Sequence, residues 1–528
     1  MLHLKRMIMS YCRIFNGRCN KLKLIAILIL FTILVSASLF HIFLNDESSG
    51  SVPQVARIKY RHRFQQVSTR NPDWGEHVAS RAFSDRRTVV RKHAPLGNRL
   101  LHRDVNESLS VARIREYCNV PLMNATGEEG EAPPGYRLVN VQVMIRHGTR
   151  SPMYSFTNHH NPQLSCKFDN AAKSNNLIRS FIGAMKTNER RQNPNSPFFR
   201  WLLYPQRKLC GPSELMPSGS MQHVLNGFHF HEKYVRKWRL FGESFRGEQV
   251  HVVSTLYSRT YQSSIAFLYS FLPRFYLNEL NIEQTSNLFC DERFVHSSCS
   301  CPALHRLKET VNVESLQFNR NNTRLFRLQK YIGNVFGLKP QQLPTMWAMM
   351  DVFMGYACNK VKPLPCNSNR KCIQPWVIAE LWDLLDGYGV KLNNLKSYQR
   401  YSQVTMHPFL AKVLEQMNLS IKNRTKVKFS LFSGHDTTIT PLAVTLGIHD
   451  GKWPHLASRI VFELYSQVGQ KDRHYVKVLY NGRNITPDAS FCQGHVINGM
   501  CKLKYFTRFV REEILQGKTY AHICHTNM

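Results

Sequence analysis

An apolar run near the N-terminus, Leu24 to Leu44, places the strongest constraint on how this 528-residue chain can fold. The run is 21 residues long, carries no formal charge at neutral pH and is long enough to cross one bilayer as a helix. Six Lys and Arg residues precede it, whereas Asp46 and Glu47 follow it. Because positive flanks stay in the cytosol, we expect a cytosolic tail over 1–23, a transmembrane signal-anchor over 24–44 and a lumenal remainder.

A cleaved signal peptide is the alternative interpretation of this run. Ser36-Ala37-Ser38 supplies the small residues of a cleavage site. However, the run exceeds the ~7–15 apolar residues that are usual for a signal-peptide core, which favours the anchor.

Glycosylation sequons occur only downstream of the apolar run, which indicates passage through the secretory pathway. A single Asn-x-Ser/Thr triplet is often accidental, but six in one lumenal segment are a consistent signal. The six asparagines are Asn106, Asn124, Asn321, Asn418, Asn423 and Asn484.

Twelve of the 14 cysteines also follow the run, and in an oxidising lumen they allow up to six disulfides. Pairing cannot be deduced from sequence, but local groups favour short loops. A zinc site at Cys299-x-Cys301 is disfavoured in this compartment. The local groups are Cys290, Cys299 and Cys301; Cys358, Cys366 and Cys372; and Cys492 and Cys501.

The chain has 70 Lys and Arg against 35 Asp and Glu, a formal charge of +35 that predicts a polyanionic partner or surface. Lumenal topology excludes nucleic acid. Residues 45–112 are predicted to be a basic lumenal stem, with twelve Lys and Arg between Arg57 and Arg103. A solvated linker and a docking strip for acidic polysaccharide both explain this stem.

Strand and helix patterns alternate after Cys118, so we expect an α/β domain over 113–528. Its fold class is a mixed, mostly parallel central sheet flanked by helices, with an inserted, mainly helical cap over roughly 275–420 in which no strand is recognised. The last two predicted strands form an antiparallel hairpin. Strands are predicted at 138–145, 249–255, 427–433, 459–465 and 474–480, and helices at 221–240, 260–271 and 376–385.

The segment Arg146-His147-Gly148-Thr149-Arg150-Ser151-Pro152 follows the first strand directly. Ligands bind beyond the carboxyl ends of strands in open α/β sheets, which puts this segment where chemistry occurs. Arginine forks match phosphate oxygens and keep their charge, and nearby cations lower the pKa of an imidazole. The segment therefore predicts a neutral histidine that attacks a bound phosphorus, although a basic surface loop is the simpler interpretation.

Two further segments follow strand ends. In Ser433-Gly434-His435-Asp436, the aspartate either caps a helix or donates a proton to a leaving alkoxide. A bound phosphate would raise the pKa of this carboxyl group and so suit an acid catalyst. The other segment, Ser254 to Thr260, contains Arg259, which alone would be read as a surface residue.

Together with Leu215, Pro217 and Gly219, these segments resemble the histidine acid phosphatase family, branch 2 of the histidine phosphatase superfamily, from about Val139 to Ile514. The family resemblance implies a phosphohistidine intermediate and neither metal nor cofactor. Two departures, Leu256 and Thr149 in place of frequent aspartates, put fine specificity in doubt. The implied roles are nucleophile for His147, proton donor for Asp436, and phosphate ligands for Arg146, Arg150, Arg259 and His435.

Within the family, a type II Golgi anchor on a basic lumenal domain is similar to members that remove the phosphate from xylose. That xylose lies in the glycosaminoglycan linkage region of proteoglycan core proteins, and Golgi glycosyltransferases that build the same region are expected partners. A general lysosomal or secreted acid phosphatase is the alternative enzyme. A non-catalytic glycosaminoglycan-binding protein is the alternative from a different class.

Other enzyme classes fit less well. The chain contains no Asp-x-Asp pair, which metal-dependent glycosyltransferases use for the nucleotide diphosphate. The spacing of a cysteine phosphatase occurs once, at Cys12 to Arg18, in the short cytosolic tail. The further ligands of a metal-dependent His-Asp phosphohydrolase cannot be assembled.

Overall fold

The computed structural model describes residues 111–119, 126–157, 159–287, 289, 301–470 and 472–525. The predicted tail, the transmembrane segment and nearly all of the stem lie outside these residues, as do Asn106, Asn124, Cys290 and Cys299. Among the described residues, no helix combines the length and the apolar composition needed to cross a bilayer.

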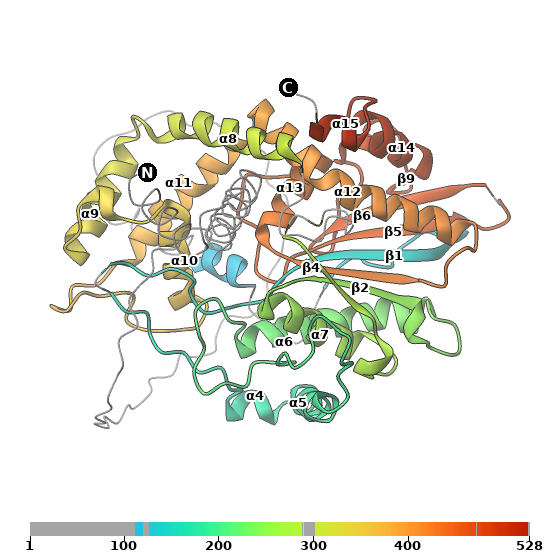
Figure 1. The fold of residues 1–528 in the computed structure, drawn as a ribbon, viewed down its shortest axis with the longest axis horizontal. Helices are drawn as coiled ribbons and strands as arrows, with labels where there is room; N and C mark the ends of the chain where they lie inside the picture. Colours follow the sequence, from blue (N-terminus) through green and yellow to red (C-terminus); the bar gives the residue numbers. More distant parts are fainter. Residues whose placement is uncertain are drawn as a thin grey trace, which may run out of the picture. The chain divides into compact units, whose positions relative to one another are not determined.

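Nine strands within the described residues form one mixed sheet, in the order β3-β2-β4-β1-β5-β6-β9-β8 with β7 paired to β6 (Figure 1). β3, β2, β4 and β1 are mutually parallel neighbours, and the pairings from β1–β5 onward are antiparallel. The bounds are β1 Tyr136–Arg146, β2 Val250–Thr255, β3 Ile282–Thr285, β4 Phe429–Gly434, β5 Arg459–Gln467, β6 His474–Tyr480, β7 Arg483–Asn484, β8 Val496–Ile497 and β9 Met500–Lys502.

The five predicted strands are confirmed as β1, β2, β4, β5 and β6, and the last two form the expected hairpin. The prediction of a mostly parallel sheet is wrong for half of it, because β5 to β9 all pair antiparallel. The expected absence of a strand in 275–420 is also wrong. β3 is a four-residue edge strand of which only Ile282 is buried, too short and too polar to show a period.

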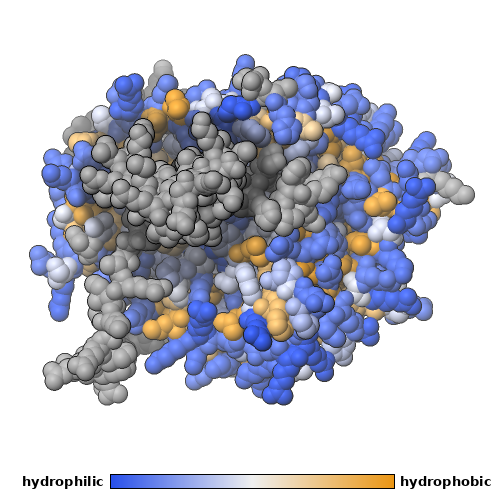
Figure 2. Space-filling model, viewed as in Figure 1, coloured by the Kyte–Doolittle hydropathy of each residue, from blue (hydrophilic) through white to orange (hydrophobic). Residues whose placement is uncertain are grey.

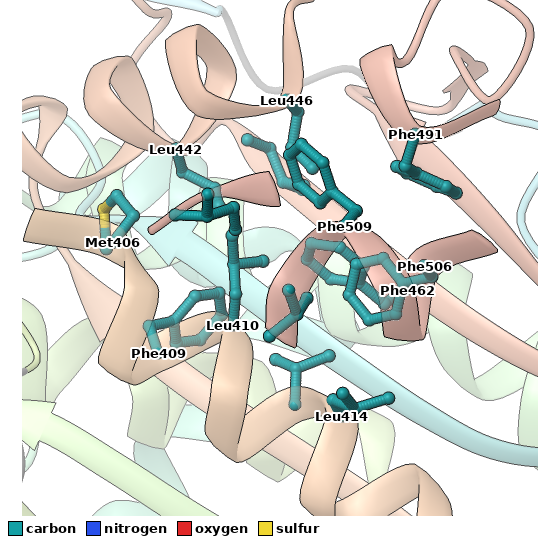
Figure 3. Close-up of a cluster of buried hydrophobic side chains, with 14 of the residues drawn as sticks. Met406, Phe409, Leu410, Leu414, Leu442, Leu446, Phe462, Phe491, Phe506 and Phe509 are labelled. Carbon is teal, nitrogen blue, oxygen red and sulfur yellow. The ribbon is translucent and has the colours of Figure 1, made fainter. Parts of the chain in front are cut away.

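Helices cover both faces of the sheet because side chains alternate along its strands (Figure 1). Val141, Val143 and Ile145 of β1 point to one face and Met144 to the other. The first face packs against α5 Asn176–Glu189, α6 Pro217–Phe230 and α7 Ser258–Phe271. The second packs against α12 Lys396–Ile421, α13 Asp436–Leu446 and α14 Leu503–Arg508, whose phenylalanines and leucines interleave in Figure 3.

The predicted helices are confirmed as α6, which continues into a π-helical segment His231–Lys237, and as α7 and α11. The short helix α4 Asn170–Ser174 lies beside α5 on the first face of the sheet, and α15 Tyr520–His525 packs against α12 on the second. On the face drawn in Figure 2, the surface of the described residues is mainly hydrophilic with scattered apolar patches.

The cap has a separate core, formed by α9 Thr323–Phe336, α10 Met346–Ala357 and α11 Pro375–Asn393. Loops that leave the sheet contribute Phe156 and Trp453 to this core. α12, which lies within the predicted cap, packs on the sheet instead, and α8 Pro302–Leu316 packs against α12 and α15.

Among the described residues, five disulfides join ten cysteines. Cys366–Cys372 and Cys492–Cys501 close short loops as expected. The preference for short loops is wrong for Cys358 and Cys301, which pair with partners 240 and 223 residues away. Local spacing carries no information about such partners. The long-range bridges are Cys118–Cys358, Cys166–Cys210 and Cys301–Cys524.

The four described sequons differ in accessibility. Asn321 and Asn423 are exposed, whereas Asn418 and Asn484 are half-buried. The Asn484 amide donates to the Gly499 carbonyl at 2.9 Å, and its oxygen accepts from the Thr486 hydroxyl at 2.7 Å. A glycan at Asn484 would replace one of the two amide hydrogens, so these bonds persist only if the remaining hydrogen is the one directed at Gly499.

Two glycines allow the loop after β1 to touch the start of α6. A Cβ on Gly148 would lie 2.4 Å from the Gly219 carbonyl oxygen, and one on Gly219 would lie 2.3 Å from the Thr149 carbonyl oxygen. Backbone therefore meets backbone here, which explains why glycine stands at both positions.

Gly219→Ala is expected to destabilise the fold, because the added methyl group meets backbone atoms that cannot rotate away. Overpacking of this kind costs about 1–3 kcal/mol, against the ~1 kcal/mol that Ala gains over Gly in a helix. Thermal unfolding should show a lower Tm. Gly183→Ala, at an exposed position of α5 where a Cβ meets nothing within 4 Å, is the matched control and should keep or raise the Tm. Equal Tm changes in the two variants would contradict the close approach.

Candidate active site

Three parallel strands end side by side and bring the predicted site residues together. In the sheet register, Arg146 of β1 lies opposite Gly434 of β4, and Ser254 of β2 lies opposite Ser433. The segments that leave these ends carry His147, His435, Asp436 and Arg259. All six predicted site residues thus lie at the carboxyl ends of these central strands: Arg146, His147, Arg150, Arg259, His435 and Asp436.

The His147 imidazole is buried and held in one tautomer. Its Nδ1 lies 2.9 Å from the Gly148 carbonyl oxygen, which can only accept, so Nδ1 carries the hydrogen and Nε2 the lone pair. Burial, followed by the charges of Arg259, Arg146 and Arg150, lowers the pKa of His147 well below its usual value. The result is a neutral imidazole with a free Nε2, as the motif predicted, although burial contributes more than the cations.

Three arginines surround this imidazole with few anionic partners. The Arg146 Nη2 donates to the Tyr117 hydroxyl at 3.1 Å, and the Arg150 Nη2 donates to Asp351 Oδ1 at 2.6 Å. The Arg259 Nη1 donates to the Ser213 hydroxyl at 3.2 Å, and its guanidinium lies 4.3 Å above the Tyr257 ring.

Each of these guanidinium groups keeps a buried Nε–H group for which the described residues offer no acceptor. Buried donors are nearly always paired in folded proteins. Three unpaired N–H groups on three charged arginines, Arg146, Arg150 and Arg259, therefore form an anion-binding cluster.

His435 completes this cluster at the N-terminus of α13. Its Nε2 lies 2.9 Å from the Thr255 hydroxyl, and its ring centroid lies 5.6 Å from that of His147. Burial and then Arg259 lower the pKa of His435 to about 3, so the ring is neutral. The first turn of α13 adds the partial positive charge of a helix N-terminus.

The neighbours of Asp436 within the protein keep its carboxyl group ionised. Burial raises the pKa of this group, but Arg146 at 3.6 Å and the Trp453 indole, which donates to Oδ2 at 2.5 Å, lower it to about 2 together with His435 and Arg150. The raised pKa predicted from the sequence depends on a bound phosphate and stays a prediction. A phosphate dianion bound between the arginines would offset their effect and raise this pKa.

Motif analysis missed the residues that hold these groups in place: Tyr117, Asp351 and Trp453. Each lies far along the chain from the group it contacts, and none belongs to a recognised motif. A buried aspartate in an otherwise apolar helix, MWAMMDVFMGYA, is the only local signal that could have indicated one of them.

The two departures from the family pattern occupy different environments. Thr149 is buried, and its backbone N–H group donates to the Gln222 side chain at 2.8 Å. Leu256 is 49% exposed at the end of β2.

No cluster of three or more His, Cys, Asp or Glu side chains in the described residues could hold a metal ion. Cys301 of the Cys299-x-Cys301 pair is bonded to Cys524.

Comparison with known proteins identifies related sequences. The family model for the histidine phosphatase superfamily (branch 2) matches residues 137–481. 2-Phosphoxylose phosphatase 1 from Xenopus tropicalis is 30% identical over 429 residues, covering 78% of this chain and 82% of the relative. The human protein of that name is 29% identical over 423 residues, covering 78% and 85%. Rat prostatic acid phosphatase is 24% identical, covering 56% and 75%.

The solved structures that the comparison matches share less sequence with this chain. The multiple inositol polyphosphate phosphatase of Bifidobacterium longum, in complex with inositol hexasulfate, superposes with a TM-score of 0.47 at 13% identity, over 75% of this chain and 96% of that one. The phytase of D. castellii has a TM-score of 0.44 at 17% identity, over 79% and 88%.

Acidification is expected to destabilise the fold through the buried imidazoles. At pH values below about 6.5 the unfolded chain binds protons that folded His147 and His435 do not, so unfolding free energy falls as pH falls. His435→Gln removes one such group and should weaken the pH dependence of stability by up to about 1.4 kcal/mol per pH unit. Thermal unfolding from pH 7 to pH 5 measures this, with His305→Gln at an exposed histidine as the control. An unchanged slope in His435→Gln would show that this imidazole is protonated normally.

Proposed function

The chain belongs to branch 2 of the histidine phosphatase superfamily, and from this membership we propose that it removes the 2-phosphate from xylose in the glycosaminoglycan–protein linkage region. As a member of this family it is a phosphoric monoester hydrolase. The observation that carries the finer proposal is the match to relatives named 2-phosphoxylose phosphatase 1, at 29–30% identity over 78% of the chain.

The charge of the chain supports the same substrate. A formal charge of +35 favours association with a polyanion, and a growing glycosaminoglycan chain is one. The proposed partners are therefore proteoglycan core proteins that carry phosphorylated xylose and acidic polysaccharide, with Golgi glycosyltransferases as neighbours on the same substrate.

The proposed location is the Golgi membrane, with one N-terminal helix and a lumenal catalytic domain. Support comes from the apolar run Leu24 to Leu44 with its positive N-terminal flank, and from five disulfides, which persist in oxidising compartments.

In the first proposed step, His147 Nε2 attacks the phosphorus atom. An N–P bond forms as the P–O bond to the sugar breaks, and the proton of Asp436 passes to the leaving sugar oxygen. Arg146, Arg150 and Arg259 stabilise the negative charge of the phosphoryl oxygens, and His435 is the fourth phosphate ligand. Asp436 acquires its proton because the bound dianion offsets the positive charge of the arginines, which otherwise lowers the pKa of this carboxyl group.

In the second step, a water molecule attacks the phosphohistidine. Asp436, now ionised, takes a proton from that water as its oxygen bonds to phosphorus, and the N–P bond breaks. Inorganic phosphate then leaves, and His147 returns to its neutral state.

The substrate proposal is tested with detergent-solubilised full-length protein. We expect kcat/KM for a 2-phosphoxyloside to exceed that for an aryl phosphate or another sugar phosphate, with His147→Ala inactive on all of them. A chelator added in parallel tests the expected independence from metal. Equal kcat/KM across the sugars would indicate a general acid phosphatase, and no turnover of any phosphate by the folded wild type would favour a glycosaminoglycan-binding protein.

Asp436→Asn is expected to slow a phosphoxyloside by about 10²- to 10⁴-fold, the usual contribution of a general acid. The loss of kcat/KM on an aryl phosphate with a good leaving group should be much smaller, because a phenolate departs without a proton and kcat/KM does not include the attack of water on the phosphohistidine. Steady-state kinetics on both substrates measure the difference. Equal losses would argue that Asp436 holds Arg146 rather than donating a proton.

A further inference from the structure

We propose that Asp351, on cap helix α10, is a positioning residue that directs Arg150 toward the phosphoryl group and thereby sets the affinity for phosphate. This inference rests on the proposed role of Arg150 as a phosphate ligand. It does not depend on which sugar carries the phosphate.

One buried carboxylate fixes both the side chain and the backbone of the loop that follows His147. Asp351 Oδ1 accepts from the Arg150 Nη2 at 2.6 Å. Its Oδ2 accepts from the backbone N–H groups of Met153 at 2.7 Å and Tyr154 at 3.2 Å. With only 6% of Asp351 exposed, water cannot replace these partners. Any shift of α10 is thus transmitted to the Arg150 guanidinium.

The face of α10 that carries Asp351 is shaped to fit this loop. Asp351, Gly355 and Asn359 are spaced by four residues, so they share one face of the helical path. A Cβ on Gly355 would lie 2.2 Å from Pro152 Cγ, which leaves no room for a side chain. The Asn359 amide donates to the Gly355 carbonyl at 2.8 Å and lies 3.5 Å from the Arg150 carbonyl oxygen.

An anion beside Arg150 offsets the repulsion between the arginines of the site. Arg150 and Arg259 repel one another, and burial together with Arg150 lowers the pKa of Arg259 to about 10. For Arg150, burial lowers the pKa, but Asp351, Tyr117 and Asp436 together outweigh burial, and the net effect raises the pKa. Asp351 thus offsets part of the repulsion that Arg150 meets among like charges.

Two hydrogen bonds, to Asp351 Oδ1 and to the Ser151 carbonyl, fix the Arg150 guanidinium. Its buried Nε–H has no acceptor in the described residues. The carboxylate therefore occupies one side of the fork and leaves other donors for a phosphoryl oxygen.

A disulfide joins the end of this helix to the residue next to Tyr117, whose hydroxyl group accepts from Arg146. Cys358, directly after α10, is bonded to Cys118, and Tyr117 beside it bonds Arg146. Arg146 and Arg150 are thus positioned by two segments outside the sheet that one covalent bond connects.

The test compares Asp351→Asn with Asp386→Asn, a matched loss of a cap carboxylate that accepts from Arg113 at 3.2 Å instead of from a site arginine. The readouts are the inhibition constant of inorganic phosphate and the KM for an aryl phosphate, measured on full-length protein. We expect Asp351→Asn to raise both about tenfold, the size expected for one charged hydrogen bond, with a smaller change in kcat. Asp386→Asn should stay within twofold. A folded Asp351→Asn variant with an unchanged inhibition constant would overturn the proposal.

A double-mutant cycle with Arg150→Met separates positioning from general support of the fold. If Asp351 acts through Arg150, adding Asp351→Asn to Arg150→Met should not weaken phosphate binding further. Additive losses would mean that Asp351 acts by another route and would also overturn the proposal.

Asp351→Glu keeps the charge and is used if Asp351→Asn does not fold. It should bind phosphate more tightly than Asp351→Ala, and equal inhibition constants in these two variants would count against the proposal. Failure of the xylose proposal leaves these measurements unaffected, because neither phosphate nor an aryl phosphate contains xylose.

Discussion

The confinement of three guanidinium groups around one neutral imidazole is the constraint on which the rest of this structure depends. Neighbouring guanidinium groups repel one another, and burial of each arginine costs part of its hydration free energy. The fold compensates with fixed partners: Tyr117 for Arg146, Asp351 for Arg150, and Ser213 with the Tyr257 ring for Arg259. Tyr117 comes from the helical residues 111–118, and Asp351 comes from the cap. Ser213 lies in the loop before α6, and Tyr257 lies between β2 and α7. The cluster is thus a tertiary product, although the groups that do chemistry all follow strand ends.

This division explains what could be predicted from the sequence. Residues such as His147 and His435 were found because a buried strand precedes each of them, and parallel strands bring their ends together. Tyr117 and Asp351 were not found, because the contact of each with an arginine depends on how separate layers pack. The same limit applies to Cys358, which pairs 240 residues away, and to β3, whose four residues gain their conformation from β2 beside them.

The charge balance of the site links catalysis to occupancy. Asp436 is a carboxylate held by Arg146 and Trp453, with a pKa of about 2. A carboxylate in this state cannot donate a proton. Under the proposed mechanism, a phosphate dianion bound between the arginines adds negative charge beside Asp436 and favours the protonated acid. The proposed acid form therefore arises when a leaving group is bound, so the site needs no permanently raised pKa.

The two positions at which this chain departs from the family pattern have different surroundings. Thr149 is buried against Gln222, so its substitution for aspartate changes internal support and cannot touch a leaving group. Leu256 is half exposed, and the adjoining Tyr257, 40% exposed, covers Arg259 and meets the His435 ring edge-on at a centroid distance of 5.0 Å. An aspartate at position 256 would add a negative charge at this exposed position and, under the proposed function, would repel a polyanionic substrate. Leucine carries no charge and places an apolar side chain next to the aromatic ring of Tyr257, and under the same proposal such surfaces suit the carbon face of a sugar.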